Sequence, residues 1–190
     1  KTSELIRRLK RLKVIGKNIL VINSAKDTRS PDQVLKTHDN VKFNCLKVFD
    51  LFNVLNMREF DEADIVAIDE AQFFDDEIVR VCNDLANKGI RVIVAGLDMD
   101  FKGNPFGPMP YLMATAEYVT KVHAICTKTG NLAQYSYRKA KSDDLVLLGE
   151  VDEYEPLSRA AYYKSMLRDK VRQMNVNDAQ EINSKQQKPD

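Results

Sequence analysis

Residues 63–74 contain the feature that most restricts how this chain can fold. Four apolar residues at positions 65–68 follow one another without a polar interruption, and the acids Asp69 and Glu70 come directly after them. A short continuous apolar run predicts a strand that is buried on both faces, as the strands of parallel sheets are. The sequence therefore predicts an α/β fold in which this strand ends at the two acids.

Two adjacent acids at the end of a buried strand are unfavourable unless a positive group meets them. Ligands of open α/β sheets bind outside the carboxyl ends of the strands. A magnesium ion with a nucleoside triphosphate meets both conditions, because one carboxylate can serve the metal while its neighbour positions or deprotonates a nucleophile. The alternative is a pair of solvated acids that open a helix, where the helix dipole favours them.

Composition restricts the class of protein. The chain has 190 residues, 44% of them hydrophobic, and a formal net charge of +1, so no overall field favours nucleic acid or a membrane surface. Apolar runs stay well below the roughly 20 residues of a membrane span. Cys45, Cys82 and Cys126 form no closely spaced pair, which argues against a disulfide framework or a four-cysteine zinc site. We therefore expect a cytoplasmic protein with no nucleic-acid or membrane partner.

Helices and strands are expected to alternate along the first 125 residues. Apolar residues at helical spacing predict a helix over residues 3–15, with Gly16 as its stop. The order predicts a mainly parallel sheet with right-handed connections and helices on both faces. Beside the acidic strand, strands are expected at 19–22, within 41–48, at 90–97 and at 118–125, and helices at 51–60, 75–87 and 111–118.

The alternation of predicted helices and strands ends after Cys126. Residues 126–154 are expected to form a long loop or hairpin, and a loop of this length in a compact domain often acts as a lid. A last helix is predicted over residues 159–171, followed by a polar, disordered tail. The predicted organisation is a nucleotide-binding domain of residues 1–125, a lid subdomain with the last helix over 126–172, and a tail over 173–190.

Lys1 and Thr2 stand directly before the first predicted helix. In a phosphate-binding loop, a lysine reaches the terminal phosphates and a Ser or Thr at the helix N-terminus ligates magnesium. The pair alone is uninformative, but together with the acidic strand it suggests such a loop. The sequence opens at this lysine, so we expect the glycines of the loop and a first buried strand to precede it in the full-length protein.

Taken together, these segments resemble the thymidine kinases of vertebrate cytosol, many bacteria and poxviruses. The segments that carry the resemblance keep the family's order over roughly residues 1–172: they are 1–8, 27–29, 37–39, 68–74, 101–107 and 145–154. The resemblance implies a P-loop (RecA-like) fold with a small C-terminal lid, or lasso, subdomain. It also implies ATP- and magnesium-dependent phosphorylation of thymidine, and of deoxyuridine, in pyrimidine salvage, with thymidine triphosphate as feedback inhibitor and a homotetrameric assembly.

The resemblance implies two catalytic residues. Glu70 matches the general base that takes the proton from the thymidine 5′-hydroxyl, and Arg29 matches a basic residue that offsets charge during phosphoryl transfer. Thr2 and Asp69 match the magnesium site. The complete set implied at ATP and its phosphates is Lys1, Thr2, Asp27, Thr28, Arg29, Asp69 and Gln72.

The nucleoside site is implied in the same way. Phe101 matches an aromatic residue that packs against the thymine ring, and a flat ring suits a flat apolar partner. Leu97 and Phe106 are expected to complete the pocket, and Tyr154 matches a tyrosine that contacts the substrate. For Phe101 and Tyr154 the alternative is ordinary core packing. The backbone groups expected to read the pyrimidine edge belong to Leu145, Val146, Leu147, Leu148 and Gly149.

The chain departs from the family pattern in its lid. Zinc usually pins this lid through two cysteine pairs, and zinc needs about four suitable ligands. Cys126 holds the first such position, but Thr129, Ser158 and Ala161 hold the others. We therefore expect no structural zinc. Packing of four tyrosines is expected to hold the lid instead: Tyr135, Tyr137, Tyr162 and Tyr163.

Two other functions remain open on the sequence alone. A non-catalytic relative that acts as a structural subunit would explain the missing cysteines, but it gives no reason to retain Glu70 and Arg29. A helicase would explain the Asp-Glu-Ala-Gln segment at 69–72. The chain length, the balanced charge and the lack of a basic track argue against a helicase.

Overall fold

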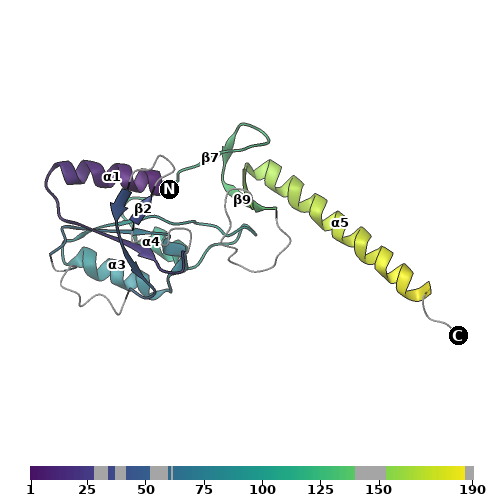
Figure 1. The fold of residues 1–190 in the computed structure, drawn as a ribbon, viewed down its shortest axis with the longest axis horizontal. Coiled ribbons are helices and arrows are strands. Elements are labelled where there is room, and N and C mark those ends of the chain that lie inside the picture. The colour runs from purple at the N-terminus through teal and green to yellow at the C-terminus, as the bar shows by residue number, and fades with distance from the viewer. Residues whose placement is uncertain (28–33, 37–41, 52–59, 61, 140–152, 187–190) are drawn as a thin grey trace. The chain divides into compact units, whose positions relative to one another are not determined.

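A computed structural model of the protein describes residues 1–27, 34–36, 42–51, 60, 62–139 and 153–186 (Figure 1). These residues fall into two compact units, one of residues 1–122 and one that begins at His123. Among the described helices, none combines the length and the apolar character needed to cross a membrane.

The first unit is built on a parallel sheet with the strand order β4-β1-β5-β6. Its central strands are β1 (Ile19–Ser24) and β5 (Ile65–Asp69), flanked by β4 (Leu46–Val48) and β6 (Arg91–Val94). All five residues of β5 are buried, which confirms the expectation from the apolar run. Because every pairing is parallel, the carboxyl ends of these strands lie along one edge of the sheet.

Helices cover both faces of this sheet (Figure 1), as the sequence predicts. Alternate residues of β5 divide between the faces, because successive side chains of a strand point to opposite sides. Ala67 packs in the cluster that contains α1 (Thr2–Val14). Val66 and Ile68 pack in the larger cluster, which contains α3 (Glu77–Asn87) and α4 (Met109–Thr115).

The helix predicted over 3–15 is confirmed, and so is its stop, since Gly16 has a φ of +75°. The helix predicted over 75–87 begins two residues later, without a side-chain hydrogen bond from Asp76 at its N-cap. Within 41–48 two short strands form, β3 (Lys42–Asn44) and β4, and β3 pairs with β2 (Val34–Lys36) in an antiparallel hairpin. The helix predicted at 51–60 falls almost entirely outside the described residues.

Two strand predictions need correction. The strand predicted over 90–97 is limited to β6, whose apolar residues are only half-buried because β6 is the outer strand of the described sheet. The strand predicted over 118–125 is wrong except at β7 (Ala124–Ile125). Tyr118, Val119 and Val122 are 90%, 50% and 45% exposed. Their alternation resembles a strand, but a strand also needs a pairing partner, and none of the described strands pairs with residues 118–123.

In the described residues of the second unit, two small antiparallel strand pairs are followed by a long helix. β7 pairs with β8 (Leu132–Ala133), and β9 (Tyr135–Arg138) pairs with β10 (Tyr154–Leu157). The last helix, α5, spans Arg159–Gln186. It therefore continues beyond the predicted end at residue 171, through most of the segment expected to be a disordered tail.

Three of the four tyrosines expected in the lid pack together in this unit. The rings of Tyr135 and Tyr162 stack with centroids 4.5 Å apart, and Tyr163 meets both edge-on. Tyr137 instead donates a hydrogen bond from its hydroxyl to Asp169 on α5, at 2.5 Å.

Candidate active site

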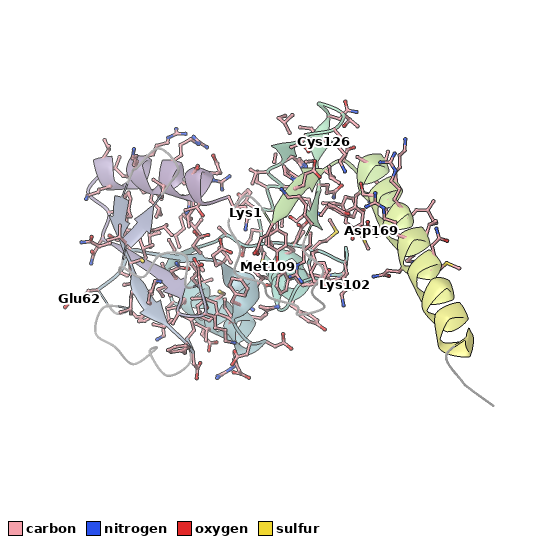
Figure 2. The ribbon with its side chains drawn as sticks, turned by 45° about the vertical axis from the view of Figure 1, so that its right-hand side comes forward. Lys1, Glu62, Lys102, Met109, Cys126 and Asp169 are labelled. Carbon is pink, nitrogen blue, oxygen red and sulfur yellow. The ribbon has the colours of Figure 1, made fainter. Side chains whose placement is uncertain are left out.

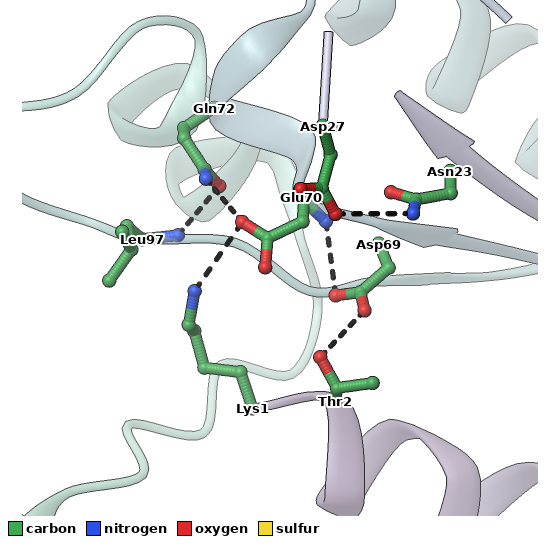
Figure 3. A network of polar contacts seen from close by, with 8 residues as sticks. All are labelled: Lys1, Thr2, Asn23, Asp27, Asp69, Glu70, Gln72 and Leu97. Atoms are coloured by element: carbon green, nitrogen blue, oxygen red, sulfur yellow. Dashed lines mark hydrogen bonds and ion pairs between the residues drawn. The ribbon is translucent and has the colours of Figure 1, made fainter. Parts of the chain in front are cut away.

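The acidic end of β5 meets the beginning of α1 at the carboxyl edge of the sheet (Figure 3). Asp69 is 1% exposed, and its Oδ2 accepts a hydrogen bond from the Thr2 hydroxyl at 2.7 Å. Its Oδ1 accepts a hydrogen bond from the backbone N–H of Glu70 at 3.0 Å. The packing of α1 against the sheet thus brings together residues that are 67 positions apart in the chain.

The electrostatic setting of Asp69 favours a cation beside it. Burial raises the pKa of this carboxyl, and the adjacent charge of Glu70 raises it further. The hydrogen bonds from Thr2 and from the Glu70 backbone act in the opposite direction but do not cancel these effects. A positive ion at this position would relieve the unfavourable burial of the carboxylate.

Glu70 changes the direction of the chain directly after the strand. Its φ of 52° and ψ of 42° lie in the left-handed region. Among the described residues, Glu70 is the only one other than glycine that has a positive φ. Its carboxylate is 3.7 Å from the Lys1 ammonium and accepts a hydrogen bond from Gln72 at 2.5 Å. The turn therefore separates the two acids, because Asp69 bonds Thr2 whereas Glu70 contacts Lys1 and Gln72.

Gln72 connects this turn to the loop that follows β6. Its Nε2 donates to Glu70, and its Oε1 accepts a hydrogen bond from the backbone N–H of Leu97 at 2.9 Å. The loop approaches the backbone of Gln72 closely, because a Cβ on Gly107 would lie 2.6 Å from the Gln72 carbonyl oxygen. A Cβ on Gly96 would lie 2.5 Å from the sulfur of Met109, the first residue of α4 (Figure 2).

Asp27 lies beyond the carboxyl end of β1, on the same edge of the sheet. It is 5% exposed, and its Oδ2 accepts a hydrogen bond from Asn23 Nδ2 at 3.4 Å. Its backbone carbonyl accepts a hydrogen bond from the Lys47 ammonium at 2.9 Å. Asn23 was not among the predicted site residues, although a polar residue at the end of an apolar strand, like Asp69, was a signal that could have identified it.

The oxygen atoms of this edge fit a magnesium ion that is bound together with phosphates. Magnesium is commonly held by one or two protein oxygens, with substrate phosphates and water completing its octahedron. The Thr2 hydroxyl and the Asp69 carboxylate form such a pair. Within the described part of the chain, no group of three or more His, Cys, Asp or Glu side chains is arranged to hold a metal by itself.

The predicted base-binding residues belong to the loop after β6. Leu97, Phe101 and Phe106 are all half-buried, so each has some apolar surface in contact with solvent. Phe106 meets Phe73 edge-on, with ring centroids 5.9 Å apart, and the Lys102 ammonium lies 5.4 Å from the centre of the Phe101 ring. Asp100 shapes the turn by accepting hydrogen bonds from the backbones of Lys102 and Asn104, each at 2.9 Å.

Other predicted site residues belong to the second unit or lie outside the described residues. Tyr154 belongs to β10 in the second unit, where its hydroxyl accepts a hydrogen bond from Arg138 Nη2 at 2.6 Å. Others lie outside the described residues: Thr28, Arg29, Leu145, Val146, Leu147, Leu148 and Gly149. The structure brings together Lys1, Thr2, Asp69, Glu70, Gln72 and Leu97.

Three of the four positions where the family carries zinc ligands are joined by hydrogen bonds in the second unit. The Thr129 hydroxyl donates to Ser158 Oγ at 3.2 Å. Burial would raise the pKa of the Cys126 thiol, but hydrogen bonds from Thr129 and Ser158 outweigh it and lower the pKa to about 6.

Comparison with known proteins identifies a common family. The sequence model described as thymidine kinase matches residues 1–162. The thymidine kinase of Bacteroides thetaiotaomicron is 52% identical over 165 residues, which cover 87% of this chain and 82% of that protein. Those of Bacteroides fragilis and Porphyromonas gingivalis are 49% and 45% identical, over 90% and 86% of this chain and 84% and 79% of their own lengths.

Proposed function

The chain belongs to the thymidine kinase family, and from this premise we propose that it transfers the γ-phosphate of ATP to the 5′-hydroxyl of thymidine. The observation that carries the proposal is the meeting of two pairs at the edge of the sheet. Lys1 and Thr2 stand at the N-terminus of α1, and Asp69 and Glu70 stand at the carboxyl end of β5. Lys1 and Thr2 have the chemistry to bind phosphate. Asp69 has the chemistry to hold a metal, and Glu70 has the chemistry to activate a hydroxyl.

On the phosphate side, the N-terminus of α1 and the Lys1 ammonium favour an anion. Thr2 and Asp69 would hold magnesium there, and the bound ion would neutralise charge on the transferred phosphate. Arg29, in the loop after β1, is proposed to offset further charge during transfer, and Asp27 and Thr28 belong to the same nucleotide site.

On the nucleoside side, Glu70 is proposed to accept the proton of the 5′-hydroxyl. Gln72 orients this carboxylate by donating a hydrogen bond to it at 2.5 Å. The same Gln72 side chain accepts a hydrogen bond from the backbone of Leu97. Gln72 therefore anchors both the proposed general base, Glu70, and the loop that is proposed to bind the thymine ring.

We propose that the thymine ring packs against Phe101, with Leu97 and Phe106 beside it, Tyr154 in contact with the substrate, and residues 145–149 reading its edge. Deoxyuridine is a second proposed substrate, because a single missing methyl group changes binding only modestly. By family resemblance we further propose a cytoplasmic salvage role, inhibition by thymidine triphosphate and a tetramer. The lid is proposed to lack zinc for a different reason, because Thr129, Ser158 and Ala161 stand at three of the four ligand positions.

The direct test is ADP release by the full-length protein with magnesium, in the presence and absence of thymidine. We expect thymidine to stimulate ATP turnover. Stimulation by nucleic acid instead would indicate a helicase-like motor. Thymidine binding without any turnover would indicate a non-catalytic relative.

The role of Glu70 has its own test. Glu70→Gln should bind thymidine normally but turn over about 10²-fold more slowly or worse, which is the usual scale for loss of a general base. Glu77→Gln is a matched control, because Glu77 lies on α3 and pairs with Arg80 at the surface. Turnover of Glu70→Gln at the wild-type rate would refute the assignment.

A further inference from the structure

Asn23 is a buried amide at the carboxyl end of β1 whose hydrogen-bonding capacity is only partly used. Its side chain is 1% exposed. Among the described residues, its Oδ1 is one of two buried side-chain atoms without a hydrogen-bond partner. Leaving such an acceptor unpaired in the interior destabilises the folded state. Because Asn23 Oδ1 lies at the edge of the proposed active site, its missing hydrogen-bond donor is expected to arrive with a bound ligand.

The position of Asn23 points to the ligand of the adjacent nucleotide site. In the sheet Asn23 is paired with Asp69 on β5 and with Lys47 on β4. Its amide points toward Asp27 and donates to that carboxylate at 3.4 Å (Figure 3). Asn23 thus contacts one buried acid of the proposed magnesium–nucleotide site, Asp27, and stands beside the other, Asp69, in the sheet.

Building on the proposed kinase function, we propose that Asn23 is a positioning residue of that site. Its amide N–H holds the Asp27 carboxylate in place, and its Oδ1 accepts a hydrogen bond from a water molecule that lies between this side chain and the bound magnesium nucleotide. Such a water needs a polar site with two to four partners, and Asn23, Asp27 and Asp69 supply polar atoms for it.

An amide suits this position better than other side chains of similar size. A third carboxylate beside Asp27 and Asp69 would add repulsion between like charges in a buried environment. A leucine would fill the same space but would remove both the donor to Asp27 and the acceptor. Asparagine supplies one donor and one acceptor without adding charge.

The test compares Asn23→Leu with Ile22→Val in the full-length protein. Ile22 is the preceding residue of β1, is fully buried in the core and has no polar atom at the site, so its variant reports loss of packing alone. For each protein, thermal unfolding with a non-hydrolysable ATP analogue is followed across a magnesium titration. Affinity for the analogue in EDTA is measured separately.

We expect Asn23→Leu to raise the magnesium concentration for half-maximal stabilisation about 10-fold or more, the scale seen when partners of metal ligands are removed. Its affinity for the analogue in EDTA should stay close to that of wild type. Ile22→Val should lower the unfolding temperature without moving the magnesium midpoint. Asn23→Ser, whose side chain is too short to reach Asp27, is measured as well in case the leucine variant does not fold.

Equal magnesium midpoints in wild type and in the folded Asn23 variants would overturn the role of Asn23 while leaving the kinase proposal intact. A wild-type protein that shows no magnesium-dependent stabilisation by the analogue would overturn both.

Discussion

Glu70 combines a proposed catalytic side chain with an unfavourable backbone conformation. A non-glycine residue in the left-handed region is destabilised by roughly 1–2 kcal/mol, because its Cβ crowds the following carbonyl. In return, the turn directs Asp69 toward Thr2 and Glu70 toward Lys1 and Gln72. Strain of this kind often accompanies functional sites, since the geometry required there is not the most stable one.

This strain can be measured by comparing Glu70→Gly with Glu70→Ala. Both variants lose the carboxylate and its contacts, and they differ only in the Cβ atom. Glycine should therefore be the more stable of the two by about 1 kcal/mol in chemical denaturation. An alanine variant as stable as the glycine variant would show that residue 70 leaves the left-handed region once its side chain is removed.

At the level of residues, the sequence identified side chains that meet at the edge of the sheet, but not the backbone conformation that brings them together. The two acids were recognisable because a continuous apolar run leads to them. The left-handed turn at Glu70 was not recognisable, because glutamate has no preference for that conformation. Asn23 carried a local signal, since it is a polar residue at the end of an apolar strand, but its place beside Asp69 depends on the pairing of β1 with β5, which no local pattern encodes.

Among the structural elements, the contact between the loop after β6 and Gln72 depends on Gly107. Its φ of +50° already favours glycine, and an added Cβ would meet the backbone oxygen of Gln72 at 2.6 Å. Gly107→Ala should therefore cost about 2–4 kcal/mol of unfolding free energy, from strain and overpacking together. Gly89→Ala is the control, because Gly89 has a φ of +83° but nothing within 4 Å of the added atom. If both variants lose the same stability, the close approach to Gln72 is not rigid.

The start of β5 is anchored by Asp64, and this anchor should depend on pH. The backbone N–H of Asn18, at 2.9 Å, and the Lys17 ammonium, at 3.0 Å, lower the pKa of the Asp64 carboxyl. Because the folded-state pKa lies below the unfolded value, the stabilisation is present above about pH 4 and is lost as the pH falls through the folded-state pKa.

Asp64→Asn should therefore lower the unfolding temperature modestly at pH 7, and the difference from wild type should shrink as the pH is lowered toward 3. The effect is small because the side chain is exposed to solvent. Lys17→Met should keep most of the pH dependence, because the Asn18 N–H is the larger cause. A constant difference between wild type and Asp64→Asn at all pH values would contradict this account.

Buried elements were the predictable ones. Periodicity identified α1, β1, β5 and α3 because each buries a continuous face, and burial is what such patterns report. The prediction of a strand over 118–125 was wrong for most of its length. Alternation of apolar and polar residues describes the side chains, but it does not show whether another strand is available to pair with the backbone. The extent of α5 was missed because its polar second half has no apolar stripe from which to predict a helix.

For the molecule as a whole, the two compact units should respond separately to a change in one of them. Tyr162 is 2% exposed and stacks on Tyr135 within the second unit. Tyr162→Ala should cost about 3 kcal/mol there, as aromatic deletions in cores do. In native-state hydrogen exchange, amides of β9 and β10 should lose protection while those of β1 and β5 keep it.

Tyr163→Ala serves as the control, because Tyr163 is 55% exposed and meets the other rings only edge-on. It should change the exchange of either unit little. If Tyr162→Ala reduced protection equally in β1 and β9, the chain would unfold as one cooperative body.

The proposed metal-binding and nucleoside-activating acids are consecutive residues, so a single peptide unit sets the spacing of their backbones, about 3.8 Å between Cα atoms. Recognition of the base is assigned to other segments: the loop after β6, which is proposed to pack against the ring, and residues 145–149, which are proposed to read its edge. Mutant libraries confined to residues 98–106 could therefore be screened for new nucleoside analogues, such as prodrugs, while the pair at 69 and 70 remains as it is. In evolutionary terms, the acceptor preference of such an enzyme can drift without a corresponding change in its transfer chemistry.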